Sequence, residues 1–201
     1  MAEVEIVDNL DCFAEEFKGV NLHAKKISKA EFETCTFISC DFSETFFCAC
    51  RFIECTFINC NLSLMKLTST KLSDLSFDSC KMIGIDWTMA DWKSLLTAEP
   101  LRFKECILND SNFFGLSLDE MIMKECRAKE VDFRNASLKR ANFKETDFKG
   151  ALFENTHLEE ANFTEAQNTH INLYKNHLKG ALFSRYEATY LLEAMGISLV
   201  D

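Results

Sequence analysis

The sequence FETCTFISCDF, residues 32–42, places a large apolar side chain at every fifth position, and the pattern continues through Phe47, Phe52 and Phe57. A small residue, cysteine or alanine, stands two places before most of these apolar residues. A period of five matches neither the 3.6-residue turn of a helix nor the two-residue alternation of a strand. It matches a coil in which each five-residue step makes one side and one corner. A single step cannot bury its apolar residue alone, so the steps are expected to stack as a solenoid.

The period covers almost the whole chain. From Cys12 to Trp92 the central residues stand at numbers ending in 2 or 7 and are all apolar. From Phe103 to Phe183 they stand at numbers ending in 3 or 8, and Asn168 is the only polar one. Asn168 is either a buried amide bonded to the backbone or a local bulge, because a buried polar group needs a partner.

The two runs are out of register by one residue, and the slip lies in residues 93–102, which contain the only proline. Proline removes a backbone donor, so the segment is expected to interrupt the solenoid. Loops on rigid scaffolds often carry partner contacts. The segment is therefore either a harmless bulge or a candidate binding loop formed by Lys93, Leu95, Leu96 and Pro100.

Ten cysteines would ordinarily suggest disulfides or a metal. Eight of them occupy the small-residue position of the repeat, so their spacing follows from the coil: Cys35, Cys40, Cys50, Cys55, Cys60, Cys80, Cys106 and Cys126. Zinc sites typically use shorter Cys spacings, often with histidine. Free thiols acting as small buried apolar groups are the preferred interpretation, and we expect neither a metal nor a cofactor.

The formal net charge of −10 disfavours direct binding to nucleic acid, although acidic proteins are common without any such meaning. No stretch reaches the length of apolar residues that a membrane span needs. The first five residues, MAEVE, lack the basic and apolar regions of a secretory signal, which predicts a cytoplasmic protein.

The C-terminal end lacks the five-residue pattern. Ser184 and Glu187 have the spacing of a capping box, and Gly196 suits the position after a helix, so a helix is expected from 185 to 195. This helix either covers the end of the solenoid or joins two copies of the chain. The second interpretation is preferred, with these dimer residues: Tyr186, Tyr190, Leu191, Leu192, Met195 and Ile197. The expected organisation is a cap at 1–11, a solenoid at 12–183 interrupted at 93–102, and a dimerisation segment at 184–201.

The segments Ala141-Asn142-Phe143-Lys144-Glu145 and Ala161-Asn162-Phe163-Thr164-Glu165 resemble the motif of the pentapeptide-repeat family. The resemblance implies an all-β fold, a right-handed quadrilateral β-helix, here followed by a short C-terminal α-helix. Residues 60–64, 80–87, 106–113 and 168–188 more narrowly resemble members that protect type II topoisomerases and confer quinolone or albicidin resistance. That resemblance implies a homodimer joined through its C-terminal ends, shaped like duplex DNA, which binds DNA gyrase.

Residues twenty apart would stack in a coil of four five-residue steps. The candidate partner-binding residues are then two columns of acids, Glu105, Glu125, Glu145 and Glu165 in one, and Glu120 and Glu160 with Arg140 between them in the other. The opposing interpretation is an ordinary solvated surface, since Lys104, Lys124 and Lys144 precede three of those acids, and exposed ion pairs contribute little.

The four histidines lie near no recognisable nucleophile, and no phosphate-binding or metalloprotease motif occurs. We therefore expect a protein that is not an enzyme. The favoured function is a DNA mimic that binds DNA gyrase and protects it from a poison. The alternative is an interaction scaffold of the same fold with a partner other than a topoisomerase.

Overall fold

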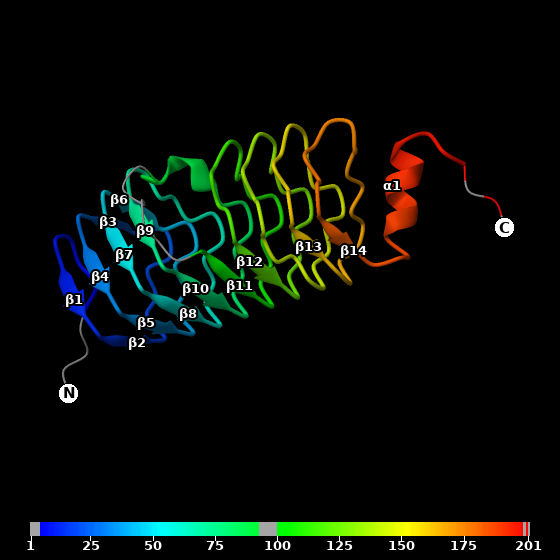
Figure 1. Cartoon of the computed structure of the whole chain (residues 1–201). Helices are drawn as coiled ribbons and strands as arrows, with labels where there is room; N and C mark the ends of the chain where they lie inside the picture. The colour runs from blue at the N-terminus through cyan, green and yellow to red at the C-terminus, as the bar shows by residue number, and fades with distance from the viewer. Residues whose placement is uncertain (1–4, 93–99, 199, 201) are drawn as a thin grey trace.

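The fifth-residue pattern winds the chain into a right-handed quadrilateral β-solenoid, as predicted (Figure 1). The computed structural model describes residues 5–92, 100–198 and 200. Its strands are two or three residues long, and the strand pairings among the described residues are parallel. The strands are β1 (Asp11–Phe13), β2 (Glu16–Lys18), β3 (Lys26–Ser28), β4 (Glu31–Glu33), β5 (Thr36–Ile38), β6 (Phe46–Cys48), β7 (Arg51–Ile53), β8 (Thr56–Ile58), β9 (Lys71–Ser73), β10 (Ser76–Asp78), β11 (Arg102–Lys104), β12 (Ile122–Lys124), β13 (Asn162–Phe163) and β14 (Leu182–Phe183).

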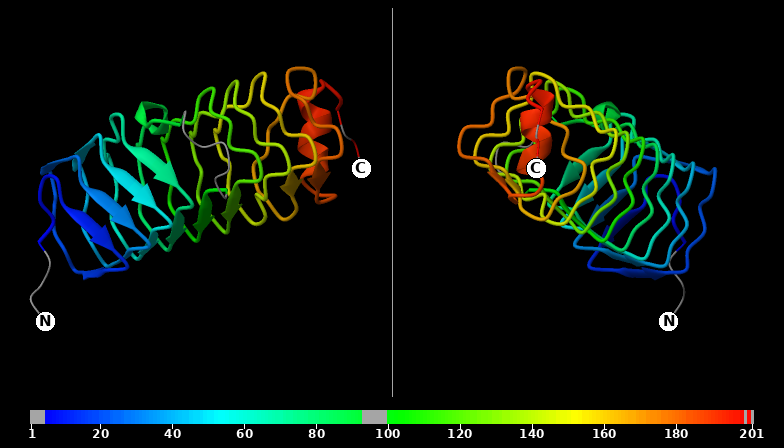
Figure 2. Two further views of the ribbon diagram at one scale, coloured as in Figure 1. Left: turned by 60° about the vertical axis from the view of Figure 1, so that its left-hand side comes forward. Right: turned by 90° about the vertical axis from the view of Figure 1, so that its right-hand side faces the viewer.

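The column has four faces, which we name A to D in chain order. Face A carries the sheet β1-β4-β7-β9, and face B carries β2-β5-β8-β10-β11-β12 and then β13-β14. Face D carries β3-β6, and face C is joined by isolated bridges such as Asn21 to Asp41. Cys12 pairs with Phe32 and Phe17 with Phe37, so one turn takes twenty residues. Figure 2 shows the turns stacked along one axis.

The core is a set of aromatic columns. On face B the rings of Phe17, Phe37, Phe57, Phe77 and Phe103 stack with centroids 4.7–5.2 Å apart and planes within 8–15° of parallel. Rings from adjacent faces meet these edge-on, and such offset and edge-to-face contacts contribute beyond the area they bury.

The small position of the repeat accepts either a thiol or a hydroxyl for one geometric reason. The Cys60 thiol donates to the carbonyl oxygen of Phe37 over 3.4 Å, and the Thr146 hydroxyl donates to that of Met123 over 2.8 Å. In both, the acceptor lies 23 residues back, on the turn below. All ten cysteines are free, and burial raises the pKa of the Cys55 thiol to about 12.

The register slip adds six residues to one turn. Lys71 pairs with Asp91 at the usual spacing of twenty, but Phe77 pairs with Phe103 and Lys81 with Ile107, which are 26 apart. The central column nevertheless continues, because the Phe77 and Phe103 rings stack at 5.2 Å. The solenoid therefore takes up the extra residues without losing its core.

Asn168 marks a second irregularity. The interpretation of Asn168 as an amide bonded to the backbone is wrong. The Asn168 side-chain amide donates to the Asp147 carboxylate over 2.6 Å and not to the backbone, and its φ is +56°. The adjacent Thr169 takes the buried position. The register is restored by His177, which pairs with His157.

The C-terminal helix α1 (Ala188–Ala194) is shorter than expected, and a single 3-10 turn, η1 (Trp87–Met89), precedes the slip. The predicted capping box is wrong. Glu187 precedes the helix but makes no cap bond, because its carboxylate instead accepts bonds from the Thr169 amide and hydroxyl at 3.3 and 3.2 Å. The carboxylate thus fixes the helix to the last turn of the solenoid.

Replacing Phe133 by alanine should lower the free energy of unfolding by about 3–5 kcal/mol, because the ring is fully buried between Phe113 and Phe153. The matched control is Phe13→Ala, since that ring is 67% exposed and its loss should change stability by roughly 0.5 kcal/mol or less. Urea melts followed by circular dichroism measure both. Equal losses in the two variants would contradict the assignment of the core.

Native protein should react quickly with a thiol reagent at one cysteine. Cys48 is the only partly exposed thiol of the ten, and burial excludes reagent from the other nine. Burial also raises the pKa of thiols such as those of Cys50 and Cys55, which disfavours the reactive thiolate. Counting thiols with dithionitrobenzoate should give one fast group in buffer and all ten in denaturant, and Cys48→Ser should remove the fast group. Several fast groups in the native protein would show that the small-residue columns are open.

Candidate protein-binding surfaces

The corners of the column carry most of the net negative charge. Among the described residues, 26 other than glycine have a positive φ, between 52° and 65°. Eleven of them are acids and two, Lys29 and Arg140, are basic, so the corners hold a net charge of −9 out of −10 for the chain. The acids are Glu44, Glu54, Asp74, Glu105, Asp110, Glu120, Glu125, Glu130, Glu145, Glu160 and Glu165.

The predicted glutamate ladder, Glu105 to Glu165, forms a real column at the edge between faces B and C. Its backbone positions are fixed by bonds such as those from the Glu105 amide to the Lys124 carbonyl and from the Glu125 amide to the Lys144 carbonyl. Lysines flank it closely: Lys104 lies 3.1 Å from Glu105, and Lys144 lies 3.0 Å from Glu145.

Counting the residue before each corner as well, the described part of this B/C edge holds five acids and four bases. Lys144 also lies 3.2 Å from Glu165, so one lysine serves two rungs of the ladder. The charge of the ladder is therefore largely balanced, as the opposing interpretation anticipated. This edge is not where the negative charge of the column accumulates.

The edge between faces A and B is more acidic. Counted in the same way over the described residues, this A/B edge holds seven acids and three bases. The acids are Glu33, Glu54, Asp74, Asp119, Glu120, Glu159 and Glu160, and the bases are Lys139, Arg140 and Lys179. Glu120 pairs with Arg140 at 2.8 Å across the turns, so the predicted column Glu120, Arg140 and Glu160 belongs to this edge.

The six extra residues enter the solenoid at the same A/B edge. Leu101 bridges the turns, since its carbonyl accepts from Ile122 while the next amide donates to Leu75. In the stack of corners along the A/B edge, the half-buried Pro100 therefore lies between Asp74 on the turn before and Glu120 on the turn after. The other residues of the candidate binding loop, Lys93, Leu95 and Leu96, lie outside the described residues.

Helix α1 both covers the end of the column and presents an apolar outer surface. Leu191, one of the predicted dimer residues, is buried against the core of its own chain with 8% of its surface exposed. Tyr186, Leu192 and Ile197 are 71%, 38% and 44% exposed. The interpretation as a cover thus concerns the inner side of the helix, and the interpretation as a dimer contact concerns its outer side.

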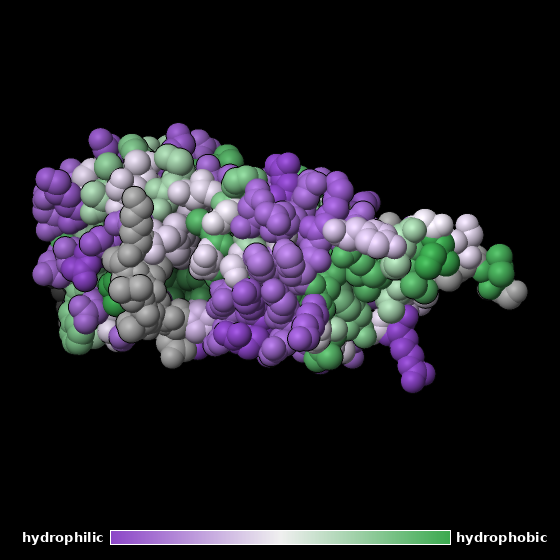
Figure 3. Space-filling model, turned by 45° about the horizontal axis from the view of Figure 1, so that its top comes forward, coloured by the Kyte–Doolittle hydropathy of each residue, from purple (hydrophilic) through white to green (hydrophobic). Residues whose placement is uncertain are grey.

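Other residues complete that apolar end. Leu182, on β14, is 56% exposed, whereas Tyr190 and Met195 are half-buried. The Tyr190 ring packs against His170 at 4.9 Å. Figure 3 shows apolar residues gathered at the C-terminal end, beside a polar middle. This end is the most apolar part of the face that the figure displays.

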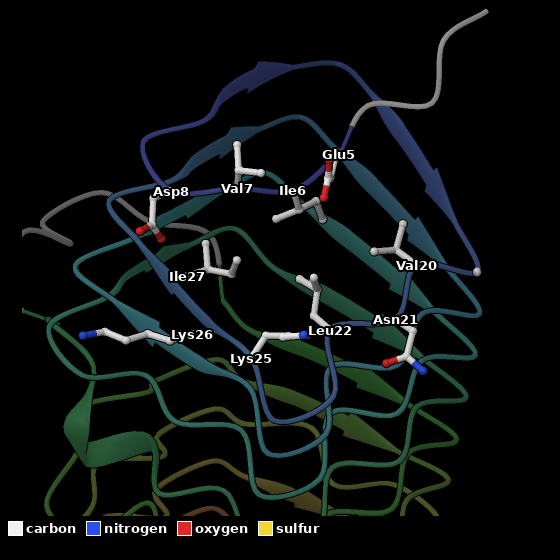
Figure 4. A pocket seen from close by; sticks show the side chains of 11 residues that line it. Glu5, Ile6, Val7, Asp8, Val20, Asn21, Leu22, Lys25, Lys26 and Ile27 are labelled. Atoms are coloured by element: carbon white, nitrogen blue, oxygen red, sulfur yellow. The ribbon is translucent and has the colours of Figure 1, made fainter.

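The N-terminal end of the column is hollow. Ile6 lies over the open first turn above Leu22 and Ile27, and Lys25 and Asp8 stand at the rim (Figure 4). The hollow measures about 930 Å³. Its lining combines apolar side chains such as Val20 and Leu22 with the charged residues Asp8, Lys25 and Lys26.

One polar cluster was missed by the sequence analysis. His157, Glu159 and His177 lie together on face A, with the two imidazole rings stacked at 4.4 Å and the His157 Nδ1 atom 3.3 Å from the Glu159 carboxylate. The signal was present, since the histidines are twenty residues apart and the glutamate lies two places from the first.

The repeat motif and the fold agree with a match to a family model. The model described as a pentapeptide repeat region matches residues 30–99 and 98–163. The chain belongs to the pentapeptide-repeat family. No curated protein matches the sequence of this pentapeptide-repeat protein.

Two solved structures show the same fold. A trypsin-treated form of QnrB1, a plasmid-mediated fluoroquinolone resistance protein, is 18% identical with a TM-score of 0.55, covering 96% of this chain and 99% of QnrB1. HetL, from the cyanobacterium Nostoc sp. strain PCC 7120 and involved in regulating heterocyst differentiation, is 17% identical with a TM-score of 0.55, covering 87% and 85%. At these identities the likeness concerns the fold.

Among the described residues, no helix has both the length and the apolar character needed to cross a bilayer.

Proposed function

We propose that this pentapeptide-repeat protein is a non-enzymatic mimic of duplex DNA that binds DNA gyrase, or a related type II topoisomerase, and protects it from a poison. The observation that carries the proposal is the placement of the negative charge. Nearly all of the net charge stands on the corners of a straight column, in lines that run along its length. Phosphates run along the two edges of a DNA groove in a comparable way.

The backbone conformation of the corners makes glutamate an unfavourable choice there as far as folding is concerned. A left-handed conformation costs roughly 1–2 kcal/mol for most residues, while glycine adopts it freely and asparagine with less difficulty. Nine glutamates occupy such corners, although Asn59, Asn135 and Asn155 show that asparagine also serves there. An interaction surface gives a reason for glutamate that turn geometry does not.

The spacing of the charges fits a partial mimic. Stacked strands lie about 4.8 Å apart, so a corner column carries at most one charge in that distance. Each strand of DNA carries one charge per about 3.4 Å of axis. With seven acids and three bases, the A/B edge is the closer match, and the B/C edge with its lysines is the poorer one. We therefore assign the partner contact chiefly to the A/B edge, joined by the loop at 93–102.

The comparisons support the proposal without deciding it. QnrB1 is described as a fluoroquinolone resistance protein, which agrees with topoisomerase protection. HetL has the same TM-score and a different described role. A scaffold with a partner other than a topoisomerase is therefore the alternative that the experiment has to separate.

We further propose a homodimer joined through residues 184–201. The outer side of α1 exposes Leu192, and Ile197 and Tyr186 extend the same apolar end. A two-fold contact there would bury apolar surface that a monomer leaves in water, and it would double the length of the column. The proposed location of this gyrase-binding dimer is the cytoplasm.

Purified protein should restore supercoiling by gyrase in the presence of a fluoroquinolone or albicidin. Glu120→Asn/Glu160→Asn should raise the concentration needed for protection about tenfold, because each exposed ion pair contributes up to about 1 kcal/mol. Asparagine tolerates the left-handed corner, so thermal stability should stay the same or rise.

The matched control is Glu105→Asn/Glu145→Asn, which removes the same number of charges from the lysine-flanked B/C edge and should change protection less. Equal effects of the two double variants would contradict the assignment to the A/B edge. If the wild-type protein has no effect on gyrase with any of these drugs, the topoisomerase proposal is wrong and the scaffold alternative stands.

Leu192→Asp/Ile197→Asp should convert the protein to a monomer in light scattering, because two carboxylates cannot be buried unpaired in an apolar contact. Tyr174→Asp is the control, since Tyr174 is 77% exposed but precedes the dimerisation segment, and it should leave the dimer intact. A persistent dimer in the double variant would refute the C-terminal contact. Both variants leave Leu191 unchanged, because its side chain packs helix α1 against the end of the solenoid.

A further inference from the structure

His157, Glu159 and His177 stand on two successive turns near the C-terminal end of face A. His157 and His177 form a parallel bridge, held by bonds from the Leu158 amide to the His177 carbonyl and from the His177 amide to the Thr156 carbonyl, at 2.8 and 3.0 Å. His157 and Glu159 are two residues apart, on either side of the buried Leu158, so both side chains lie on the outer surface. The backbone therefore fixes all three side chains next to one another.

The three side chains offer the donors that a borderline transition metal prefers. Imidazole nitrogen and carboxylate oxygen are common zinc ligands, and three protein ligands with one open position is a frequent zinc arrangement. One ligand atom from each residue lies within 4.8 Å of the others. Bonds of about 2.0–2.2 Å require ligand atoms about 3.4 Å apart in a tetrahedron, so side-chain rotations must bring the ligand atoms closer by up to about 1.4 Å.

The surroundings leave room for that rotation. The side chains of His157 and Glu159 are 40% and 29% exposed, and His177 is exposed, so an ion and a water can reach them. The second carboxylate oxygen of Glu159 is buried and has no hydrogen-bond partner among the described residues. The Lys139 ammonium lies 4.0 Å from the other carboxylate oxygen of Glu159. A metal ion bound closer to that oxygen would replace this long contact.

We propose that His157, Glu159 and His177 bind one divalent transition-metal ion of the zinc type on the outside of the solenoid. The ion ties the turn of His157 to the turn of His177, which is followed by the last strand and the α1 lid. The fourth position is left to water. Glu159 also belongs to the A/B edge, but binding of the ion requires no gyrase, so the site can be tested independently of the proposed function.

Zn²⁺ competed against a chromophoric chelator measures the site in untagged, full-length protein. We expect one Zn²⁺ per chain and a rise in the thermal midpoint, since an ion that binds the folded chain stabilises it. His177→Asn should weaken binding by about tenfold or more, because even changes next to a metal ligand cost 10–100-fold. His23→Asn, at an exposed histidine near the other end, should leave binding unchanged.

Co²⁺ identifies the ligands. Nitrogen and oxygen ligands give no thiolate charge-transfer band, whereas binding to any of the ten cysteines gives one. A thiolate band, unaltered affinity in His177→Asn, or no Zn²⁺ bound per chain would each overturn the proposal. Circular dichroism of each variant shows that the fold is retained, as expected for changes on exposed side chains.

Discussion

The structure depends on one set of hydrogen bonds, those that run from each turn of the solenoid to the next. The Glu54 amide donates to the Ser73 carbonyl and the Glu125 amide to the Lys144 carbonyl, each nineteen residues further along, and the same offset recurs along the column. Outside the slip, these bonds hold each residue above its counterpart twenty residues earlier. Aromatic rings then stack in the interior, and any charge repeated at that spacing becomes a line on the surface. The interior order and the exterior pattern have the same cause.

Because the interior positions admit mainly apolar side chains, the repeats of this chain differ most from one another at the corners and outward-facing positions. The small position most often holds cysteine, alanine or threonine, although larger apolar residues such as Met121 and Val131 also occur there. Cysteine and threonine donate to the equivalent carbonyl oxygen on the turn below. The corners accept any residue that endures a positive φ. What distinguishes this column from another of the same fold is therefore mainly the chemistry of its edges, and fold likeness alone carries little information about the partner.

The sequence predicted the fold well because its signal is a period that no helix or strand shares. The slip at 93–102 was also visible, since six added residues shift a five-residue period by one. Features that depend on three-dimensional neighbours were harder. Ser184 and Glu187 have capping-box spacing, but in the folded chain the Glu187 carboxylate accepts a hydrogen bond from the Thr169 hydroxyl instead. Leu191 was predicted as a dimer residue, and packing of α1 on the column buries it within its own chain. A local pattern does not reveal which side of a terminal helix is covered.

The candidate surfaces show how far the repeat arithmetic reaches. The stacking of residues twenty apart was sufficient to find the column of Glu105 and its lysine neighbours. The same arithmetic, applied to His157 and His177, places their rings in one column. It could not show that the acids favour strained corners, since φ is not read from a repeat. That preference is the stronger argument for a charged interface, because folding alone would favour glycine or asparagine at the positions that Glu120 and Glu160 occupy. A residue that is unfavourable for the backbone and exposed to solvent is best explained by what it contacts outside the chain.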